Sequence, residues 1–404
     1  MSDLLERLQR LGEVGRTGEG IERPLFSEAE HQARTLLAGW ARASGFDVQQ
    51  DAIGNLFIRR PGAWASPPLQ TGSHLDTVKG GGRYDGAYGV VGGLCALEAL
   101  ARRGVEMRHP IERVAWAGEE GSRFPKGCLG SSVYAGLTTR QQALALRGDD
   151  GMSFADALRG PSGLLAEVPV RETPRMPCGY VELHIEQGPI LERNGLRLGV
   201  VTAIAGQRRL RISIGGEAGH AGTVPMAYRR DAFNAAAEIA VELERAARRI
   251  GECVATIGMV RVEPNQTNVI PGRAEIRLDV RSVDDERVRR MIDELEQLAR
   301  AVRERRNVSI ELEPLEERAA TPLDPALRGA VRTVVEALGH PVFEIPSGAG
   351  HDAMCIAKVA PAAMIFVPSI GGASHVGHER TAPEDLQLGV TALAETLVEA
   401  DRLL

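Results

Sequence analysis

The chain has 404 residues, of which 43% are hydrophobic and 25% charged, and its formal net charge is −6. A chain of this length exceeds the size at which one hydrophobic core keeps growing, so we expect two domains. The small acidic excess offers no general attraction to phosphate backbones or anionic lipid, because such binding depends on clustered Lys and Arg. We therefore expect no nucleic-acid partner.

The five cysteines indicate a reducing compartment, because they are odd in number, widely scattered and nowhere spaced as C-x-x-C. The first residues, MSDLLERLQRLGEVG, place leucines at helical spacing among charges and lack the basic start and unbroken apolar core of a signal peptide. No apolar run approaches the ~20 residues that a bilayer crossing requires. We expect a cytoplasmic protein without a membrane partner.

In the first half of the chain, short apolar runs alternate with helical stretches, which is typical of an α/β sheet with helices on its faces. The predicted strands are 56–58, 69–73, 111–116 and 180–185. After Asp85, the segment GAYGVVGGLCALEALARRG carries a helical apolar stripe and ends in residues that suit a helix C-terminus. Asp85 stands where the N-cap of that helix is expected.

The pattern changes near Gly206, where strands and helices follow in the order β-α-β-β-α-β. This order is typical of a ferredoxin-like domain, and its length of roughly a hundred residues suits a compact unit. The α/β pattern then resumes, with a helix near 326–338 and a strand near 363–367. We expect a discontinuous catalytic α/β domain, 1–207 and 318–404, interrupted by an inserted ferredoxin-like domain, 208–317.

Histidines and carboxylates occur in loops that follow predicted strands, and such loops converge at the carboxyl edge of an open α/β sheet. The candidate metal ligands are His74, Asp85, Glu119, Glu120, His184, His375 and His378. Imidazole and carboxylate are ligands of zinc, manganese and cobalt, and one carboxylate can bridge two ions. Each residue alone is more often an ordinary loop residue, and the flanking glycines also serve loop closure. Spacing alone therefore leaves both interpretations open.

Several longer runs carry a family resemblance. They are TGSHLDTVKGGGRYDGAYGV, GEEGSRF, ELHIEQGPILE, GQRRLRISIGGEAGHAGTVPMAYRRDA, TNVIPG, PSGAGHDAM and MIFVPSIGGASH, in order over nearly the whole chain. Together they resemble the hydantoinase/carbamoylase family of dinuclear metal amidohydrolases. The resemblance implies hydrolysis of the ureido C–N bond of an N-carbamoyl-L-amino acid, with allantoate or ureidoglycolate as the alternative substrate. All of these are small ureido-carboxylates.

The resemblance also implies two divalent metal ions, zinc or manganese, although cobalt and nickel suit the same ligands. The implied ligands are His74, Asp85, Glu120, His184 and His375. Asp85 would bridge the two ions. His74 and His184 would bind different ions, and Glu120 and His375 would also bind different ions. His184 stands where related aminoacylases and peptidases usually have an acidic residue, which disfavours an aminoacylase or dipeptidase.

Further roles follow from the same resemblance. The implied catalytic residues are Glu119 as general base, Asp76 as a carboxylate that orients a ligand imidazole, and His220, which helps to polarise the scissile carbonyl. The implied substrate-binding residues are Gln207, Asn268, Arg281, Gly350 and His351. Arg281 would bind the substrate carboxylate, for which a guanidinium fork is well suited.

The inserted domain of related enzymes commonly pairs two subunits and closes over the substrate, so we expect a homodimer. The chain departs from the family pattern at Tyr88, Gly219 and Gly377, and His378, next to Gly377, is an additional histidine. We expect these positions to lie near the pocket. A catalytically silent scaffold on the same fold is the alternative from another class. It is disfavoured because the implied ligands and Glu119 are all present.

Overall fold

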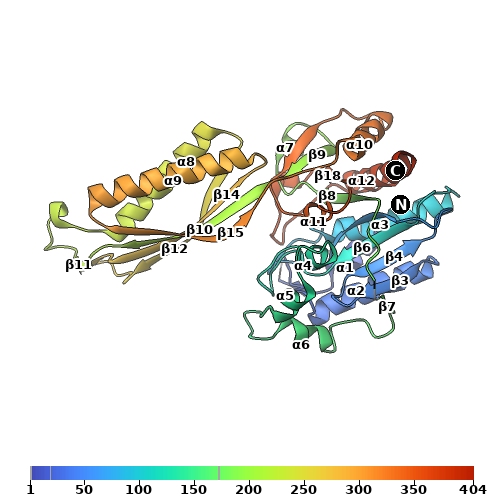
Figure 1. Cartoon of the computed structure of the whole chain (residues 1–404), viewed down its shortest axis with the longest axis horizontal. Helices are drawn as coiled ribbons and strands as arrows, with labels where there is room; N and C mark the ends of the chain where they lie inside the picture. The colour runs from blue at the N-terminus through green and yellow to red at the C-terminus, as the bar shows by residue number, and fades with distance from the viewer. Residues whose placement is uncertain (1, 19, 172) are drawn as a thin grey trace. The chain divides into compact units, whose positions relative to one another are not determined.

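The computed structural model describes residues 2–18, 20–171 and 173–404 (Figure 1). Its internal contacts divide the chain into unit 1, Met1–Thr202 with Leu323–Leu404, and unit 2, Ala203–Pro322. The predicted boundaries lie slightly inside unit 2, so Gln207 belongs to unit 2 rather than to the larger unit. The division of roles between a catalytic and a lid domain stays a prediction.

A mixed sheet forms the centre of unit 1. Across the sheet, its parallel strands follow in the order β18 (Ala362–Val367), β8 (Gly179–Ile185), β5 (Leu69–His74) and β6 (Ile111–Trp116). Further strands are β4 (Leu56–Arg60), β3 (Asp47–Asp51) and β7 (Val170–Arg171) on one side, and β9 (Gly199–Ile204) and β17 (Glu344–Ser347) on the other. The last residues of β9 pair with β16 (Thr321–Pro322), which belongs to unit 2. The strands predicted from the apolar runs are therefore confirmed.

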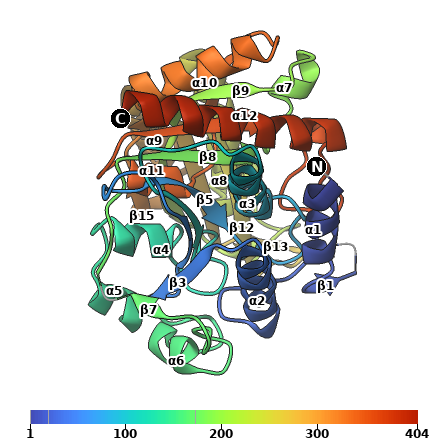
Figure 2. The same cartoon turned by 90° about the vertical axis from the view of Figure 1, so that its right-hand side faces the viewer.

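Helices cover this sheet, and Figure 2 shows α3 and α12 side by side. The helices of unit 1 are α1 (Ser2–Gly12), α2 (Glu28–Ala43), α3 (Ala87–Arg102), α4 (Leu129–Tyr134), α5 (Arg140–Ala145), α6 (Phe154–Arg159), α7 (Ile190–Arg193), α10 (Pro325–Ala337), α11 (Asp352–Ile356) and α12 (Pro383–Leu403). Smaller elements are β1 (Arg16–Thr17), β2 (Gly20–Ile21) and the 3-10 turn η2 (Ile370–Gly372). Within the described ranges, none of the helices combines the length and apolar character that a bilayer crossing requires.

The period of two along β8 decides which side chains reach which face of the sheet. Val181, Leu183 and Ile185 belong to the large apolar core that α3 and α12 share. Tyr180 and Glu182 point to the opposite face, where Glu182 accepts a hydrogen bond from the amide of Ala353 in α11, with 2.8 Å between N and O. His184 shares this second face, which therefore carries polar rather than apolar side chains.

The start of α3 corrects two expectations. The N-cap is Gly86, at φ 63°, rather than Asp85, whose carboxylate faces the histidines instead. A Cβ at Gly86 would lie 2.4 Å from the ring of His74, so only glycine fits there. Tyr88 is fully buried, and its hydroxyl donates to the carbonyl of Leu386 at 2.8 Å, which places this residue in the core between α3 and α12 and not at the pocket.

Unit 2 has one four-stranded antiparallel sheet in the order β12-β14-β10-β15. Its strands are β10 (Gly206–Gly215), β12 (Val254–Glu263), β14 (Arg273–Ser282) and β15 (Ser309–Arg318). The remaining elements are α8 (Ala232–Ile250), α9 (Asp285–Arg306), the two-residue strands β11 (Gly219–His220) and β13 (Val269–Ile270), and the 3-10 turn η1 (Met226–Tyr228). The predicted order of strands and helices is confirmed.

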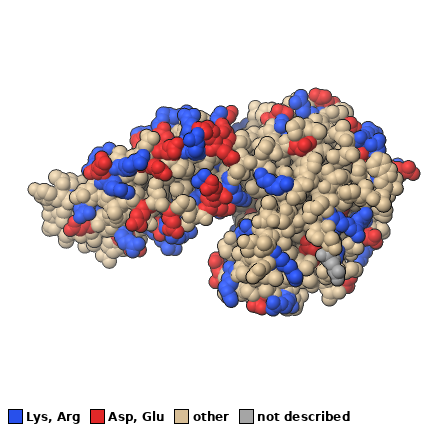
Figure 3. Space-filling model, in the orientation of Figure 1, with Lys and Arg blue, Asp and Glu red and all other residues tan. Residues whose placement is uncertain are grey.

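The two helices of unit 2 pack on one face of its sheet and enclose a separate apolar core. Asp231 and Asp284 cap α8 and α9, because their carboxylates accept hydrogen bonds from the free amides of each first turn. Basic and acidic side chains are interspersed over these helices, as Figure 3 shows. The end of unit 2 that carries β11 instead shows few charged side chains in Figure 3, and the apolar side chains of Met226 and Tyr228 are exposed.

Candidate metal centre

The carboxyl ends of the parallel strands bring the predicted ligands of unit 1 together. His74 is the last residue of β5, and His184 lies near the end of β8. Glu120 follows β6, and His375 lies in the loop after β18. Because parallel strands end at the same edge of a sheet, these side chains converge although they are far apart in the sequence.

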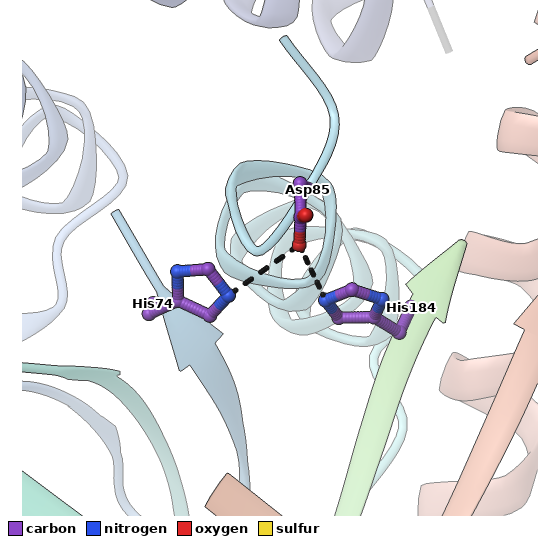
Figure 4. Close-up of side chains that lie close together, drawn as sticks. All are labelled: His74, Asp85 and His184. Carbon is purple, nitrogen blue, oxygen red and sulfur yellow. Dashed lines mark ion pairs between the residues drawn. The ribbon is translucent and has the colours of Figure 1, made fainter. Parts of the chain in front are cut away.

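Asp85 lies at the centre of the group (Figure 4). Its Oδ1 is 3.6 Å from Nε2 of His74 and 3.3 Å from Nε2 of His184. The two imidazole rings are inclined by 29° to each other, with 6.1 Å between their centroids. Ligand atoms of these three residues lie within 4.8 Å of one another, which is a separation that a single metal ion can bridge.

The other oxygen of Asp85 faces a second group. Its Oδ2 is 3.0 Å from Nε2 of His375, and that nitrogen is 3.6 Å from Oε2 of Glu120. His74 and His184 therefore share one side of Asp85, whereas Glu120 and His375 share the other. This grouping differs from the expected one, because β5 and β8 are adjacent strands and place their two imidazoles next to each other.

The electrostatics of the cluster suit cations. Burial and the negative charge of Asp85 raise the pKa of Glu120 to about 8. Burial would also raise the pKa of Asp85, but hydrogen bonds with His184, His375 and His74 hold it well below its usual value. Buried carboxylates that repel one another, faced by imidazole nitrogens on both sides of Asp85, form a donor set that fits two divalent ions.

Three residues that the sequence analysis left without a role support Asp85. Gln187 donates from Nε2 to Oδ2 of Asp85 at 2.8 Å, and the hydroxyl of Ser374 donates to the same oxygen at 3.2 Å. Glu379 accepts a hydrogen bond from the amide of Asp85 at 3.1 Å, and its Oε2 lies 3.1 Å from the Ser374 hydroxyl as an alternative acceptor for the same proton. Gln187 and Ser374 lie inside the runs HIEQG and GGASH, so their nearness to ligands in the sequence was the available signal.

Asp76 contacts His74 in a different way from the one expected. The Nδ1 atom of His74 lies 2.9 Å from the backbone carbonyl oxygen of Asp76, while the carboxylate is 3.7 Å away. The carboxylate instead accepts hydrogen bonds from the amides of Glu119 and Glu120, at 3.1 and 3.2 Å. Asp76 thus connects the loop after β5 to the loop after β6.

Glu119 lies beside the cluster, with its Oε2 at 3.7 Å from Nε2 of His74. His351 lies behind His184, with 4.6 Å between ring centroids. It is buried, and its Nε2 is 2.8 Å from the hydroxyl of Ser347. Burial, with the nearby charge of His184, lowers the pKa of His351 well below its usual value, so the ring is neutral. Gly350 precedes it and is half-buried.

Gln207 and Arg281 lie together in unit 2, because they are register partners on β10 and β14. Both contact Asp279: Nε2 of Gln207 lies 2.6 Å from Oδ2, and Nε of Arg281 lies 2.9 Å from Oδ1. A second nitrogen of Arg281 is 3.2 Å from Oδ2 of the same carboxylate. The guanidinium expected to bind a substrate carboxylate is thus held by a carboxylate of its own strand.

His220 and Asn268 form a second pair in unit 2, near the opposite end of the sheet. β11 and β13 pair antiparallel, and the amide of Ala221 donates to the carbonyl of Asn268 at 3.0 Å. Both side chains are exposed. His378, the additional histidine of unit 1, is also exposed.

Comparison with known proteins identifies the family. A model of peptidase family M20/M25/M40 matches residues 64–399. The chain belongs to this family. It is 39% identical over 397 residues to an N-carbamoyl-L-amino acid amidohydrolase of Geobacillus stearothermophilus, covering 98% of this chain and 97% of that protein. It is 37% identical over 387 residues to the allantoate amidohydrolase of Escherichia coli K12, covering 94% and 93%.

A solved structure agrees with this assignment of the M20-family chain. The crystal structure of a hydantoinase/carbamoylase family amidase from Burkholderia multivorans matches with a TM-score of 0.92 at 38% identity, covering 98% of this chain and 97% of that one. The resemblance seen in the sequence is confirmed. The protein is a metal-dependent hydrolase that acts on amide-type C–N bonds.

Proposed function

We propose that this M20-family chain hydrolyses the ureido group of an N-carbamoyl-L-amino acid, with one water, to ammonia, carbon dioxide and the free amino acid. The observation that carries the proposal is the donor set on both sides of Asp85, with His184 rather than an acidic residue facing Oδ1. The relative from Geobacillus stearothermophilus, named for this activity, supports the substrate class.

The donor set would hold two divalent ions, one at His74, Asp85 and His184 and one at Asp85, Glu120 and His375. Zinc or manganese suits these ligands, and cobalt or nickel also does. When bound, the ions polarise the scissile carbonyl and make water more acidic. Glu119 takes the proton of the attacking water and delivers it to the leaving nitrogen. Asp76 holds the backbone of Glu119 while this happens.

Unit 2 would supply the grip on the rest of the substrate, as a ferredoxin-like lid and dimerisation domain. Arg281 would pair with the substrate carboxylate and Gln207 would bind beside it, in place of part of their contact with Asp279. His220 and Asn268 would act at the ureido carbonyl. Gly350 and His351 would contact the substrate from unit 1.

The geometry of unit 2 supports a homodimer if Arg281 and His220 contact the same substrate. Gln207 and Gly215 stand at opposite ends of β10, and at about 3.3 Å per residue they lie roughly 26 Å apart. His220 lies beyond Gly215, while Arg281 pairs with Gln207. One small substrate does not reach both ends of one sheet. We therefore assign Arg281 and His220 in one active site to different subunits.

Two surfaces of unit 2 suit pairing with a second copy. Within the described part of the chain, β12 is an edge strand that pairs with β14, and it exposes Val254 and Val260. An exposed edge of this length is a template for a further strand. The apolar side chains of Met226 and Tyr228 at the β11 end also suit burial against a partner.

Allantoate or ureidoglycolate is the second candidate substrate, favoured by the similarity to the Escherichia coli allantoate amidohydrolase. The deciding experiment is ammonia release from a panel of N-carbamoyl-L-amino acids, allantoate and ureidoglycolate, by protein depleted of metal and reloaded with zinc, manganese, cobalt or nickel. We expect the highest kcat/KM on an N-carbamoyl-L-amino acid. A preference for allantoate or ureidoglycolate would select the second candidate. Activity on acyl-amino acids or dipeptides alone would reject both candidates. No activity with any substrate would favour a catalytically silent scaffold.

A further inference from the structure

Glu119 has a contact that its proposed role as general base does not explain. The thiol of Cys128 donates a hydrogen bond to Oε1 of Glu119, with 3.2 Å between sulfur and oxygen. The other carboxylate oxygen, Oε2, is the one that faces His74. The thiol therefore holds one oxygen of Glu119 and leaves the other directed at the metal centre.

The backbone of Cys128 is fixed by hydrogen bonds on both sides. Its amide donates to the carbonyl of Glu119 at 2.7 Å, and its own carbonyl accepts from the hydroxyl of Ser131 at 3.1 Å. Cys128 also adopts a left-handed backbone conformation, φ 50° and ψ 39°, immediately before α4. Residues other than glycine rarely adopt this conformation, and where they do, it often serves a functional site.

The thiol of Cys355 lies near that of Cys128. The neighbouring Cys355 thiol of α11, together with burial, raises the pKa of the Cys128 thiol well above its usual value. The thiol is therefore protonated and able to donate. Both cysteines are buried, so the arrangement runs from α11 through Cys128 to Glu119 inside unit 1.

We propose that Cys128 is a positioning residue, whose S–H···O hydrogen bond fixes the rotamer of Glu119 and so selects Oε2 as the oxygen that handles the proton. The inference rests on the proposed role of Glu119 and adds a residue that acts on the reaction without touching the substrate. Loss of the donor frees the carboxylate to rotate, so turnover falls while substrate binding and metal content stay the same.

The test compares purified, metal-loaded Cys128→Ala and Cys128→Ser with wild type on the N-carbamoyl-L-amino acid that wild type hydrolyses best. For Cys128→Ala we expect kcat to fall about tenfold, as is common when a group that orients a catalytic residue is removed, with KM changed by less than about twofold. For Cys128→Ser, whose hydroxyl can donate to Glu119, we expect at least about half of wild-type kcat. Cys178→Ala is the matched control, because Cys178 precedes β8 at the end of the sheet away from the centre.

Two results would overturn the inference. One is wild-type kcat in Cys128→Ala, and the other is an equal loss in the Ala and Ser variants, which would indicate a packing role only. A second measurement does not need the Ala variant: the infrared S–H stretch that disappears in Cys128→Ser should shift in Glu119→Gln, and an unchanged band would contradict the hydrogen bond. Full turnover in Glu119→Gln would instead reject the proposed base, whereas an inactive Glu119→Gln with a fully active Cys128→Ala rejects only the positioning role.

Discussion

The carboxylate of Asp76 holds the backbone amide of Glu119, with 3.1 Å between oxygen and nitrogen. Asp76→Ala removes this acceptor and leaves the part-buried amides of Glu119 and Glu120 without it, at a cost of about 1 kcal/mol in the free energy of unfolding. We also expect kcat to fall about 10- to 100-fold, because the loop that carries the base loosens. Thermal unfolding and steady-state kinetics measure both effects. The exposed Asp149→Ala is the control, and wild-type kcat in Asp76→Ala would disprove the role.

Glu119→Gln keeps the shape of the side chain but removes its ability to accept a proton. The variant should bind metal as wild type does and lose about 10²- to 10⁴-fold in kcat. Metal content by elemental analysis and ammonia release are the two measurements. Glu106→Gln, an exposed change of the same chemistry, should behave as wild type. Near-normal turnover in Glu119→Gln would remove Glu119 from the mechanism.

The convergence of the candidate ligands could be predicted from the sequence because they follow strands whose apolar runs are unmistakable. Strand ends are local features, and the convergence of parallel strands at one edge follows from the fold class. The grouping of His74 with His184 on one side of Asp85 was missed, because it depends on which strands are neighbours in the sheet. The contact of Cys128 with Glu119 likewise depends on a loop conformation that no local pattern indicates.

The sequence analysis also assigned Arg281 to the substrate without its partner Asp279, although both lie in the run AEIRLDVR. Alternation along a strand shows that two side chains share a face, but not that they form an ion pair. Tyr88 was expected near the pocket because it departs from the family pattern. Its hydroxyl instead donates to the carbonyl of Leu386 inside the core.

Arg281→Ala should raise KM for a carboxylate substrate by about 10- to 100-fold, which corresponds to the loss of about 1.5–3 kcal/mol from charge-assisted hydrogen bonds. The effect should disappear with the matching substrate carboxamide, since that ligand has no charge to bind. Arg277→Ala is the control, because Arg277 lies on the same strand and pairs with Glu275. If Arg281→Ala and Arg277→Ala give equal KM values, another group binds the carboxylate.

Mixing two impaired variants, assayed at a substrate concentration far below the raised KM of Arg281→Ala, tests the division of the active site between subunits. In a heterodimer of His220→Ala and Arg281→Ala, one site has both wild-type residues and the other has neither. After unfolding and refolding of an equal mixture, random pairing should restore about a quarter of the wild-type sites. Each variant refolded alone is the control. A mixture no more active than its components would place both residues in the same subunit's site.

The number of ions that each chain binds tests the role of Asp85 most directly. After saturation with zinc or manganese and removal of free ions, elemental analysis of wild type should give two ions per chain. Because Oδ1 and Oδ2 face different ligand groups, Asp85→Ala should lose both ions, whereas His375→Ala should keep one. A wild-type chain with a single ion, or an Asp85→Ala variant that retains two, would contradict the bridged centre.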